Sequence, residues 1–224
     1  MIIMRNTLLM LLAILLFPIA GLAETGEWQL AKEQDGIRVY TRDIAGSGYR
    51  EFKGEMMVDA NINQLLGLLD DTQACPQWMH NCIAPLLLSE ASERERYTYM
   101  RNDLPWPFGD RELLVHSLIN QEPASGAVTI TLTGIDDDAL PLDAQSKLPA
   151  KKKYERAAGL QGFWRFTPEG NRQHVVYQMH IDLGGSPAPA LANAQIADTP
   201  LYTLINMRKL IELEKYHQFK IPTD

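Results

Sequence analysis

Hydrophobic residues recur at every second position in several stretches of the chain, a pattern typical of β-strands with one covered face. The alternation is clearest at residues 37–42, 51–58, 128–133 and 175–183. Further strand-like stretches are residues 95–101, 112–119 and 162–167. Turn-forming residues separate most of these segments, and short consecutive strands favour antiparallel hairpins over alternating strand–helix units. The pattern therefore predicts a largely antiparallel sheet.

Two segments follow a helical pattern instead. Ile62, Leu65, Leu66 and Leu69 fall on one helix face, and Asn61 is a candidate N-cap. The second predicted helix covers residues 189–216, follows a glycine-rich turn, and at about 1.5 Å per residue is long enough to cross the concave face of a curved sheet. Pro200 lies in its middle and predicts a kink or a break. Together the elements predict an α+β protein.

The N-terminus has the pattern of a secretory signal peptide. Arg5 precedes a short apolar run, and Gly21 and Ala23 are small residues at the expected cleavage site. The apolar run is short for a membrane span, so an uncleaved anchor is the less favoured alternative. We expect residues 1–23 to be removed and residues 24–224 to form one domain that is periplasmic or secreted.

Charge and motif content narrow the function classes. The net charge is −7, which argues against nucleic acid as a partner because phosphate binding requires clustered basic residues. The run Lys151-Lys152-Lys153 is read as solvated charge or, alternatively, as a contact for anionic headgroups. The chain contains no nucleophile elbow, phosphate-binding glycine loop or zinc-protease motif. We therefore expect neither an enzyme nor a cofactor.

The two cysteines, Cys75 and Cys82, leave two interpretations open. On a straight helix they would be too far apart for a disulfide, but Pro76 makes a straight helix improbable, so a bridge closing a small loop is one outcome. Together with His80 they are also a weaker candidate for a metal site, which lacks an evident fourth ligand.

Several short motifs, taken in order, resemble the START (StAR-related lipid-transfer) family, in particular its bacterial secreted members. The similarity spans about residues 27–216. It rests on Gly36-Ile37-Arg38-Val39-Tyr40, Trp78, Leu104 to Glu112, Gly162-Phe163-Trp164-Arg165-Phe166 and Gly184-Gly185-Ser186-Pro187. The chain departs from the family pattern at Arg111-Glu112, where an Asp usually follows the Arg. The polar tunnel positions of sterol carriers cannot be aligned, so sterol specificity does not follow.

The resemblance implies a helix-grip fold, in which a curved antiparallel sheet wraps the C-terminal helix around a hydrophobic tunnel. Such a tunnel needs apolar walls and a few polar groups that orient the ligand. The candidate wall residues, for which ordinary core packing is the alternative, are Trp78, Met100, Trp164, Met179, Leu191 and Leu204. The polar candidates, for which solvent exposure or structural pairing is the alternative, are Arg101, Arg111, His116, His180 and Asp182.

The segment from Leu104 to Gly109 is the candidate gate. Trp106 and Phe108 are costly to leave in water, so they are expected either to pack on the C-terminal helix and close the tunnel or to enter a membrane interface. By resemblance, this loop and the terminal helix form the lid, and a kink at Pro200 would let that lid move.

These observations predict a carrier that binds one hydrophobic ligand, such as a lipid or a sterol-like molecule, outside the cytoplasm. Transient contact with a membrane surface fits this function. The alternative is an enzyme that acts on an aromatic or polycyclic substrate with His116 or His180 as general base. A scaffold whose pocket binds a partner is a third, weaker interpretation.

Overall fold

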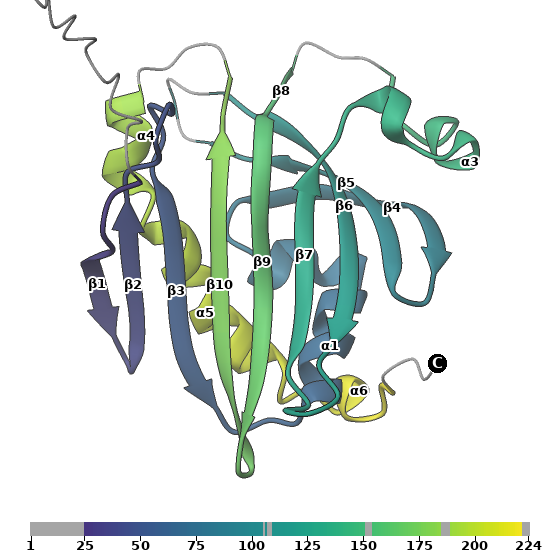
Figure 1. Cartoon of the computed structure of the whole chain (residues 1–224). Helices are drawn as coiled ribbons and strands as arrows, with labels where there is room; N and C mark the ends of the chain where they lie inside the picture. Colours follow the sequence, from purple (N-terminus) through teal and green to yellow (C-terminus); the bar gives the residue numbers. More distant parts are fainter. Residues whose placement is uncertain (1–24, 105, 107–108, 151–153, 185–188, 221–224) are drawn as a thin grey trace, which may run out of the picture.

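A computed structural model describes residues 25–104, 106, 109–150, 154–184 and 189–220. One curved sheet dominates it (Figure 1). The strands are β1 (Gln29–Gln34), β2 (Ile37–Arg42), β3 (Glu51–Val58), β4 (Cys82–Ser92), β5 (Glu95–Asn102), β6 (Arg111–Gln121), β7 (Val128–Gly134), β8 (Glu155–Arg156), β9 (Ala158–Glu169) and β10 (Arg172–Asp182). The helices are α1 (Ile62–Asp70), α2 (Cys75–Trp78), α3 (Leu142–Gln145), α4 (Pro189–Gln195), α5 (Asp198–Leu210) and α6 (Glu214–His217), with short 3₁₀ turns η1 (Thr72–Ala74) and η2 (Asp137–Ala139).

The strand order is β1-β2-β3-β10-β9-β7-β6-β5-β4, and every neighbouring pair along this path is antiparallel. The short strand β8 pairs in parallel with the start of β6. Helices α1 and α5 lie against the same face of the sheet (Figure 1). The predicted helix-grip arrangement and the predicted strands are confirmed, whereas β1, β4 and β8 were not predicted from the sequence.

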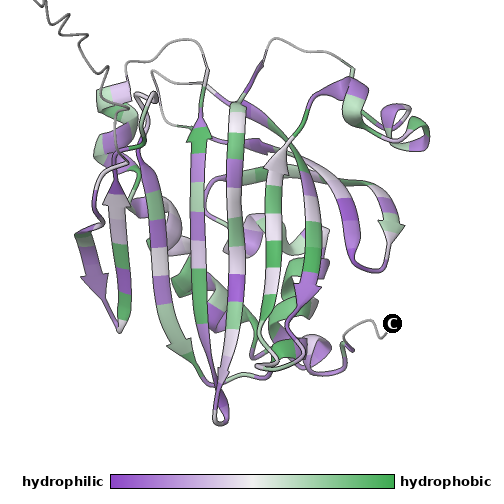
Figure 2. Ribbon diagram, viewed as in Figure 1, coloured by the Kyte–Doolittle hydropathy of each residue, from purple (hydrophilic) through white to green (hydrophobic). Residues whose placement is uncertain are grey.

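Hydrophobic and hydrophilic residues alternate along the strands (Figure 2), so that each kind lies mainly on one face of the sheet. On β10, Val175, Tyr177 and Met179 are buried in the main core, and the alternate residues face the other way. That core lies between the sheet and the helices. A second, smaller cluster around Leu88, Tyr99 and Leu114 is covered by α3 and its flanking turns.

Helix α1 begins where the sequence predicts. Asn61 accepts a hydrogen bond from the backbone N–H of Gln64 at 3.1 Å, and the Gln64 side chain accepts one from the Asn61 N–H at 3.0 Å. This capping box satisfies two backbone donors that a helix start leaves free. The buried residues Leu65, Leu66 and Leu68 then hold the helix on the core.

The C-terminal helix over residues 189–216 is broken, as Pro200 predicts, although the break lies before Pro200. Helix α4 ends at Gln195 and α5 begins at Asp198. Pro200 causes this break, because its ring would clash with the carbonyl of Ile196, four residues earlier, and it cannot donate a hydrogen bond to it. Pro200 therefore lies in the first turn of α5, where a proline is tolerated, and not in the middle of a helix.

Helix α5 packs closely on β3 because Gly54 has no side chain. A Cβ at Gly54 would lie 2.8 Å from Leu204 Cδ1 and 2.9 Å from Pro200 Cβ. Leu204 is fully buried at this contact. The close approach leaves no internal space where Leu204 meets Gly54, so any cavity must lie away from this contact.

Candidate functional site: two adjoining cavities

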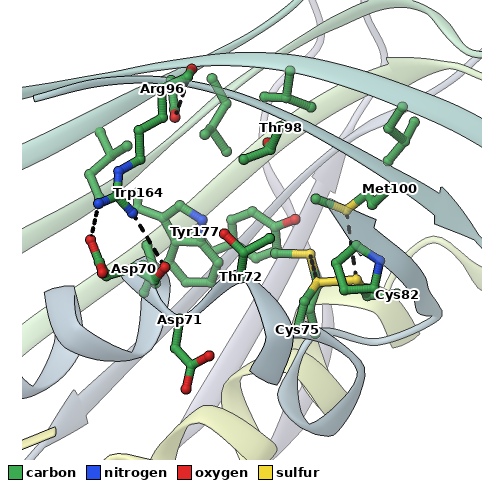
Figure 3. Close-up of a pocket in the computed structure, with 18 of the residues that line it drawn as sticks. Asp70, Asp71, Thr72, Cys75, Cys82, Arg96, Thr98, Met100, Trp164 and Tyr177 are labelled. Carbon is green, nitrogen blue, oxygen red and sulfur yellow. Dashed lines mark hydrogen bonds and ion pairs between the residues drawn. A yellow bond between two sulfur atoms is a disulfide. The ribbon is translucent and has the colours of Figure 1, made fainter. Parts of the chain in front are cut away.

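An inner cavity of about 150 Å³ lies between the concave face of the sheet and the segment from α1 to α2. Alternate residues of the central strands line it: Leu113, Val115, Ser117 and Ile119 of β6, Ile130 and Leu132 of β7, and Tyr177, Met179 and Ile181 of β10. Figure 3 shows Trp164 and Tyr177 on the sheet side and Thr72, Cys75 and Cys82 on the helix side. Most of the lining is apolar, so the cavity favours apolar ligand groups over water.

Three aromatic residues in contact form one wall of the inner cavity. The Trp164 ring lies parallel to the Tyr177 ring with centroids 3.9 Å apart, and the Trp78 ring meets Trp164 edge-on at 5.9 Å. All three residues are buried. Burial also raises the pKa of the Tyr177 hydroxyl well above its ordinary value, so this group stays protonated.

A charged group borders the same cavity at the end of α1. The Arg96 guanidinium pairs with the carboxylate of Asp70 and, at 2.7 Å, with that of Glu90. Burial raises the pKa of Asp70, and the neighbouring Arg96 opposes that shift. Two carboxylates thus balance the positive charge of Arg96 without any contribution from a ligand.

An outer cavity of about 500 Å³ adjoins the first. It lies under α4 and the start of α5, next to β3, the end of β10 and residues 102–104 at the end of β5. Its lining is more polar and includes Asn81, Asn102, Asp103, Asn193, Gln195, Asp198 and Thr199. The two cavities share five lining residues, namely His80, Asn102, Met179, Ile181 and Thr199. The two cavities therefore adjoin, the outer one with a more polar lining and the inner one with a more apolar lining.

His80 lies where the two cavities meet. Its backbone N–H donates to Thr203 Oγ1 at 3.0 Å, and its ring packs on Tyr202 with centroids 5.2 Å apart, so α5 fixes its position. Burial lowers the pKa of His80, although the nearby Asp198 carboxylate partly opposes this. The imidazole is therefore largely neutral at neutral pH.

A disulfide joins Cys75 and Cys82, whose Cα atoms lie 6.0 Å apart, and both residues line the inner cavity (Figure 3). It closes the loop that carries Trp78, Met79 and His80. This outcome decides between the two interpretations of the cysteines. Because both sulfurs are used in the bond, they are not metal ligands, and the described part of the chain has no group of three or more metal-binding side chains.

The structure separates the predicted wall residues into two groups. Trp78, Met100, Trp164 and Met179 line the inner cavity, and Met179 also lines the outer one. Leu191 is 41% exposed on α4, and Leu204 is buried in the contact between α5 and β3. These two leucines line neither cavity, because α4 turns Leu191 outward and Gly54 lets Leu204 fill the space at the sheet.

The predicted polar residues all lie outside the cavities. His116, His180 and Arg101 occupy the strand positions that alternate with lining residues, so they face away from the interior. Each has a structural partner: Glu95 Oε1 lies 2.8 Å from His116 Nε2, Ser47 Oγ lies 3.0 Å from His180 Nε2, and Asp110 lies 3.0 Å from Arg101.

Arg111 and Asp182 likewise have structural roles. Arg111 is 3% exposed, and its guanidinium donates to the carbonyl oxygens of Leu183 at 2.6 Å and Gly109 at 3.1 Å. Asp182 accepts a hydrogen bond from the backbone N–H of Gly184 at 2.8 Å. Both residues fix the end of β10 and contact no cavity.

The predicted gate loop is only partly described. Trp106 is 92% exposed and does not pack on the C-terminal helices, which corrects that alternative. Phe108, the run Lys151–Lys153, the turn residues 185–188 and the predicted signal peptide lie outside the described residues. Among the described residues, no helix has the length and apolar character needed to cross a bilayer.

The sequence interpretation missed Tyr177, Arg96 and Asp70 as site residues. Tyr177 shares a strand face with the predicted Met179, so the alternation itself contained that signal. Arg96 and Asp70 come from different elements that only the fold brings together.

No model of a known protein family matches the sequence. An uncharacterized protein of Pseudomonas aeruginosa is 31% identical over 211 residues, which cover 93% of this chain and 99% of that protein. A STAR-related lipid transfer protein of Xanthomonas axonopodis, known from the crystal structure of a fragment, is 33% identical. That match has a TM-score of 0.73 and covers 83% of this chain and 99% of the other.

Human StAR-related lipid transfer protein 5 has the same fold at 14% identity, with a TM-score of 0.70 and coverage of 85% of this chain and 88% of the human one. The identity and coverage of the Xanthomonas match are high enough to establish common ancestry as well as a shared fold. By sequence and structure together, this chain belongs to the START-related lipid-transfer family.

Proposed function

We propose that this protein binds one hydrophobic molecule, such as a lipid or a sterol-like compound, and carries or shields it outside the cytoplasm. The observation that carries the proposal is the inner cavity, a largely apolar space bordered by the sheet, α1 and α2. Burying a few hundred Å² of ligand surface at about 25 cal/mol per Å² supplies several kcal/mol before the costs of association are subtracted.

The two cavities suggest how such a ligand lies. The inner cavity, at about 150 Å³, resembles in size an engineered protein cavity of roughly 150 Å³ that binds benzene. The outer cavity, at about 500 Å³, has the size of a small-molecule pocket. An apolar group therefore occupies the inner cavity, and the remainder of the ligand, including its polar groups, occupies the more polar mouth. This division favours a compact amphiphile.

Two features support a location outside the cytoplasm. The N-terminal sequence has the pattern of a signal peptide. The disulfide between Cys75 and Cys82 suits an oxidising compartment, since disulfides are rare in reducing ones. In that compartment the protein would exchange its ligand through transient contact with membrane surfaces.

The alternative function, an enzyme with His116 or His180 as general base, has less support. Both histidines face away from the cavities, so neither can reach a substrate bound there. His80 borders both cavities and is the one histidine among the described residues that does. A carrier returns its ligand unchanged, and this property separates the two functions.

Native mass spectrometry of the protein purified from a bacterial periplasm tests the proposal. We expect one co-purifying apolar molecule per chain, recovered chemically unchanged after long incubation. Leu132→Trp fills the inner cavity and should abolish that mass, whereas Thr131→Trp, on the opposite face of β7, should retain it. Overpacking costs about 1–3 kcal/mol, so the unfolding of both variants must be measured as well.

Equal retention of the ligand by the folded Leu132→Trp and Thr131→Trp variants would contradict binding in the inner cavity. A chemically altered ligand would favour catalysis over transport.

A further inference from the structure

The charged groups of the outer cavity are all of one sign. Two carboxylates line it, Asp103 and Asp198, whereas no lysine or arginine of the described residues does. Asp198 is half-buried and pairs with the Lys32 ammonium, which is not part of the lining. Asp103 follows β5 and is exposed. Its carboxylate is therefore the lining charge that a ligand meets.

Four primary amides also line the outer cavity. The Asn193 side chain is engaged by the backbone of the loop between β2 and β3. The side chains of Asn81, Asn102 and Gln195 have no hydrogen-bond partner among the described residues, and all three are half-buried or exposed, so a ligand can reach them. Each amide offers donors and an acceptor.

This set of groups defines the polar end of a ligand that fits. A carboxylate only accepts hydrogen bonds, so a ligand group beside Asp103 must donate one. A hydroxyl or an amide can donate to Asp103 and also pair with the free amides. A carboxylate or phosphate group cannot donate, loses water without gaining a cation, and is repelled by Asp103.

The inner cavity offers no better position for a negative group. Its lining is largely apolar, and carboxylates outnumber guanidinium groups there as well. Trp78 Nε1 has no hydrogen-bond partner, but it is too deeply buried for a ligand to touch. The charged residues that line the inner cavity are Asp70, Asp71, Glu93, Arg94 and Arg96.

We propose that the outer cavity takes a polar group that donates hydrogen bonds and carries no negative charge, such as a hydroxyl or an amide. The protein thereby favours uncharged amphiphiles over carboxylates and phosphate esters. This inference rests on the proposed function, because it names the class of the bound ligand. Asp103 is then a specificity residue, which attracts donor groups and repels anionic ones.

Two probes of nearly equal shape test the inference. The compounds 6-phenylhexanamide and 6-phenylhexanoate differ in their polar end, and both carry a phenyl ring, the size of benzene, which fits a cavity of roughly 150 Å³. Methyl signals of Met100 and Met179, which line the inner cavity, report that each probe enters it. In calorimetric titrations at about pH 8, the amide should bind the wild type about 10-fold more tightly than the carboxylate.

Reversal of the charge at Asp103 gives the second readout. Asp103→Lys should raise the carboxylate-to-amide affinity ratio by about 3- to 10-fold, and added salt should reduce this effect because it screens exposed charges. Taking the ratio cancels changes that affect both probes. Asp59→Lys is the matched control, because it changes the net charge equally at an exposed position outside both cavities, and it should leave the ratio unchanged.

The outcomes separate this inference from the proposed function. If both probes bind and the carboxylate binds the wild type as tightly as the amide, the charge preference is refuted and the apolar binding site stands. Equal effects of Asp103→Lys and Asp59→Lys would refute the role of Asp103, since net charge would then explain the preference. If neither probe binds, both proposals fail.

Discussion

Single residues tie distant parts of this chain together, and Asp71 is the clearest case. Its carboxylate accepts hydrogen bonds from Lys215 Nζ at 2.7 Å and from the Tyr216 hydroxyl at 3.2 Å. The other carboxylate oxygen accepts from the Ala74 N–H at 3.2 Å. The hydrogen bond from Lys215 is the largest cause of a lowered pKa for Asp71. This residue therefore links the end of α1 to α6.

The lowered pKa predicts a pH-dependent contribution to stability. Above the ordinary value of 3.8 the folded and unfolded states both carry the charge, and the contribution is complete. It is lost as the pH falls below 3.8 and through the lower folded value, because the unfolded state binds the proton first. Asp71→Asn keeps an acceptor for Ala74 and should lower the free energy of unfolding by about 0.5–1 kcal/mol near pH 6, since the pair is partly exposed.

Urea unfolding of the wild type and of Asp71→Asn, from near pH 6 down to about pH 2, measures this difference. The two curves should converge in acid. Asp59→Asn, at an exposed position, should follow the wild type throughout. A difference for Asp71→Asn that stays constant across the range would rule out the charge as its cause.

At the scale of elements, α4 is the part of the protein best placed to act as a lid. It covers the outer cavity, and none of its residues is buried. The Asn193 side chain holds it to the loop between β2 and β3 by accepting from the Arg50 N–H at 2.9 Å and donating to the Gly48 carbonyl at 2.9 Å. The break between α4 and α5 gives α4 freedom to move while α5 stays packed in the core.

Asn193→Ala should therefore speed ligand release while leaving global stability nearly unchanged. The exchange of a fluorescent fatty-acid analogue into an excess of phosphatidylcholine vesicles measures the rate, which should rise several-fold. Leu191→Ala is the control on the same helix, because Leu191 is exposed and lines neither cavity. If both variants release the probe at the wild-type rate, α4 is not the lid. Pro200→Ala removes the residue that causes the break before α5, so it should slow the release of the probe.

The loop between α2 and β4 depends on its disulfide. Cross-linking a loop of this size restricts the unfolded chain and is worth about 2–3 kcal/mol by chain entropy. The double variant Cys75→Ala/Cys82→Ala should lower the free energy of unfolding by that amount in urea titrations. Dithiothreitol should destabilise the wild type similarly and leave the double variant unaffected. A wild type that does not respond to complete reduction would contradict the predicted contribution.

At the scale of the whole molecule, the exposed Trp106 marks a candidate contact with membranes. It follows the segment Asn102–Leu104, which borders the mouth of the outer cavity. Tryptophan favours the membrane–water interface, so a ligand could pass from bilayer to mouth near this loop. The net charge of −7 opposes binding to anionic surfaces, and neutral vesicles are therefore the suitable test.

Trp106→Ala should weaken co-sedimentation with phosphatidylcholine vesicles and slow ligand transfer between them, without changing ligand affinity in solution. Leu142→Ala is the matched control, because Leu142 is 84% exposed on α3, away from both cavities. An equal effect of the two substitutions would show that general surface hydrophobicity, and not this loop, governs the contact.

Much of the fold was predictable because its signals are local. Asn61 and the apolar face of residues 62–69 specify α1, and strict alternation specifies β2, β3, β7 and β10. Strand β4 escaped prediction because Pro85 and a run of three leucines interrupt the alternation. The break in the long terminal helix was predicted from Pro200, but it lies one turn before that residue, at Ile196.

The site was less predictable, because a cavity depends on which strand face meets which helix. Alternation along a strand shows that it has two faces but does not show which face borders a cavity. From the sequence, His116 and His180 were therefore as plausible as Met179 as cavity-lining residues. Only the packing of the sheet against α1 and α5 decided between them. The sequence alone determined the antiparallel sheet, the first helix and the family resemblance, since these follow from short-range patterns. Only the tertiary structure decided the disulfide, the two adjoining cavities and the unpaired indole of Trp78, because each depends on contacts between elements far apart in the chain or on side-chain geometry.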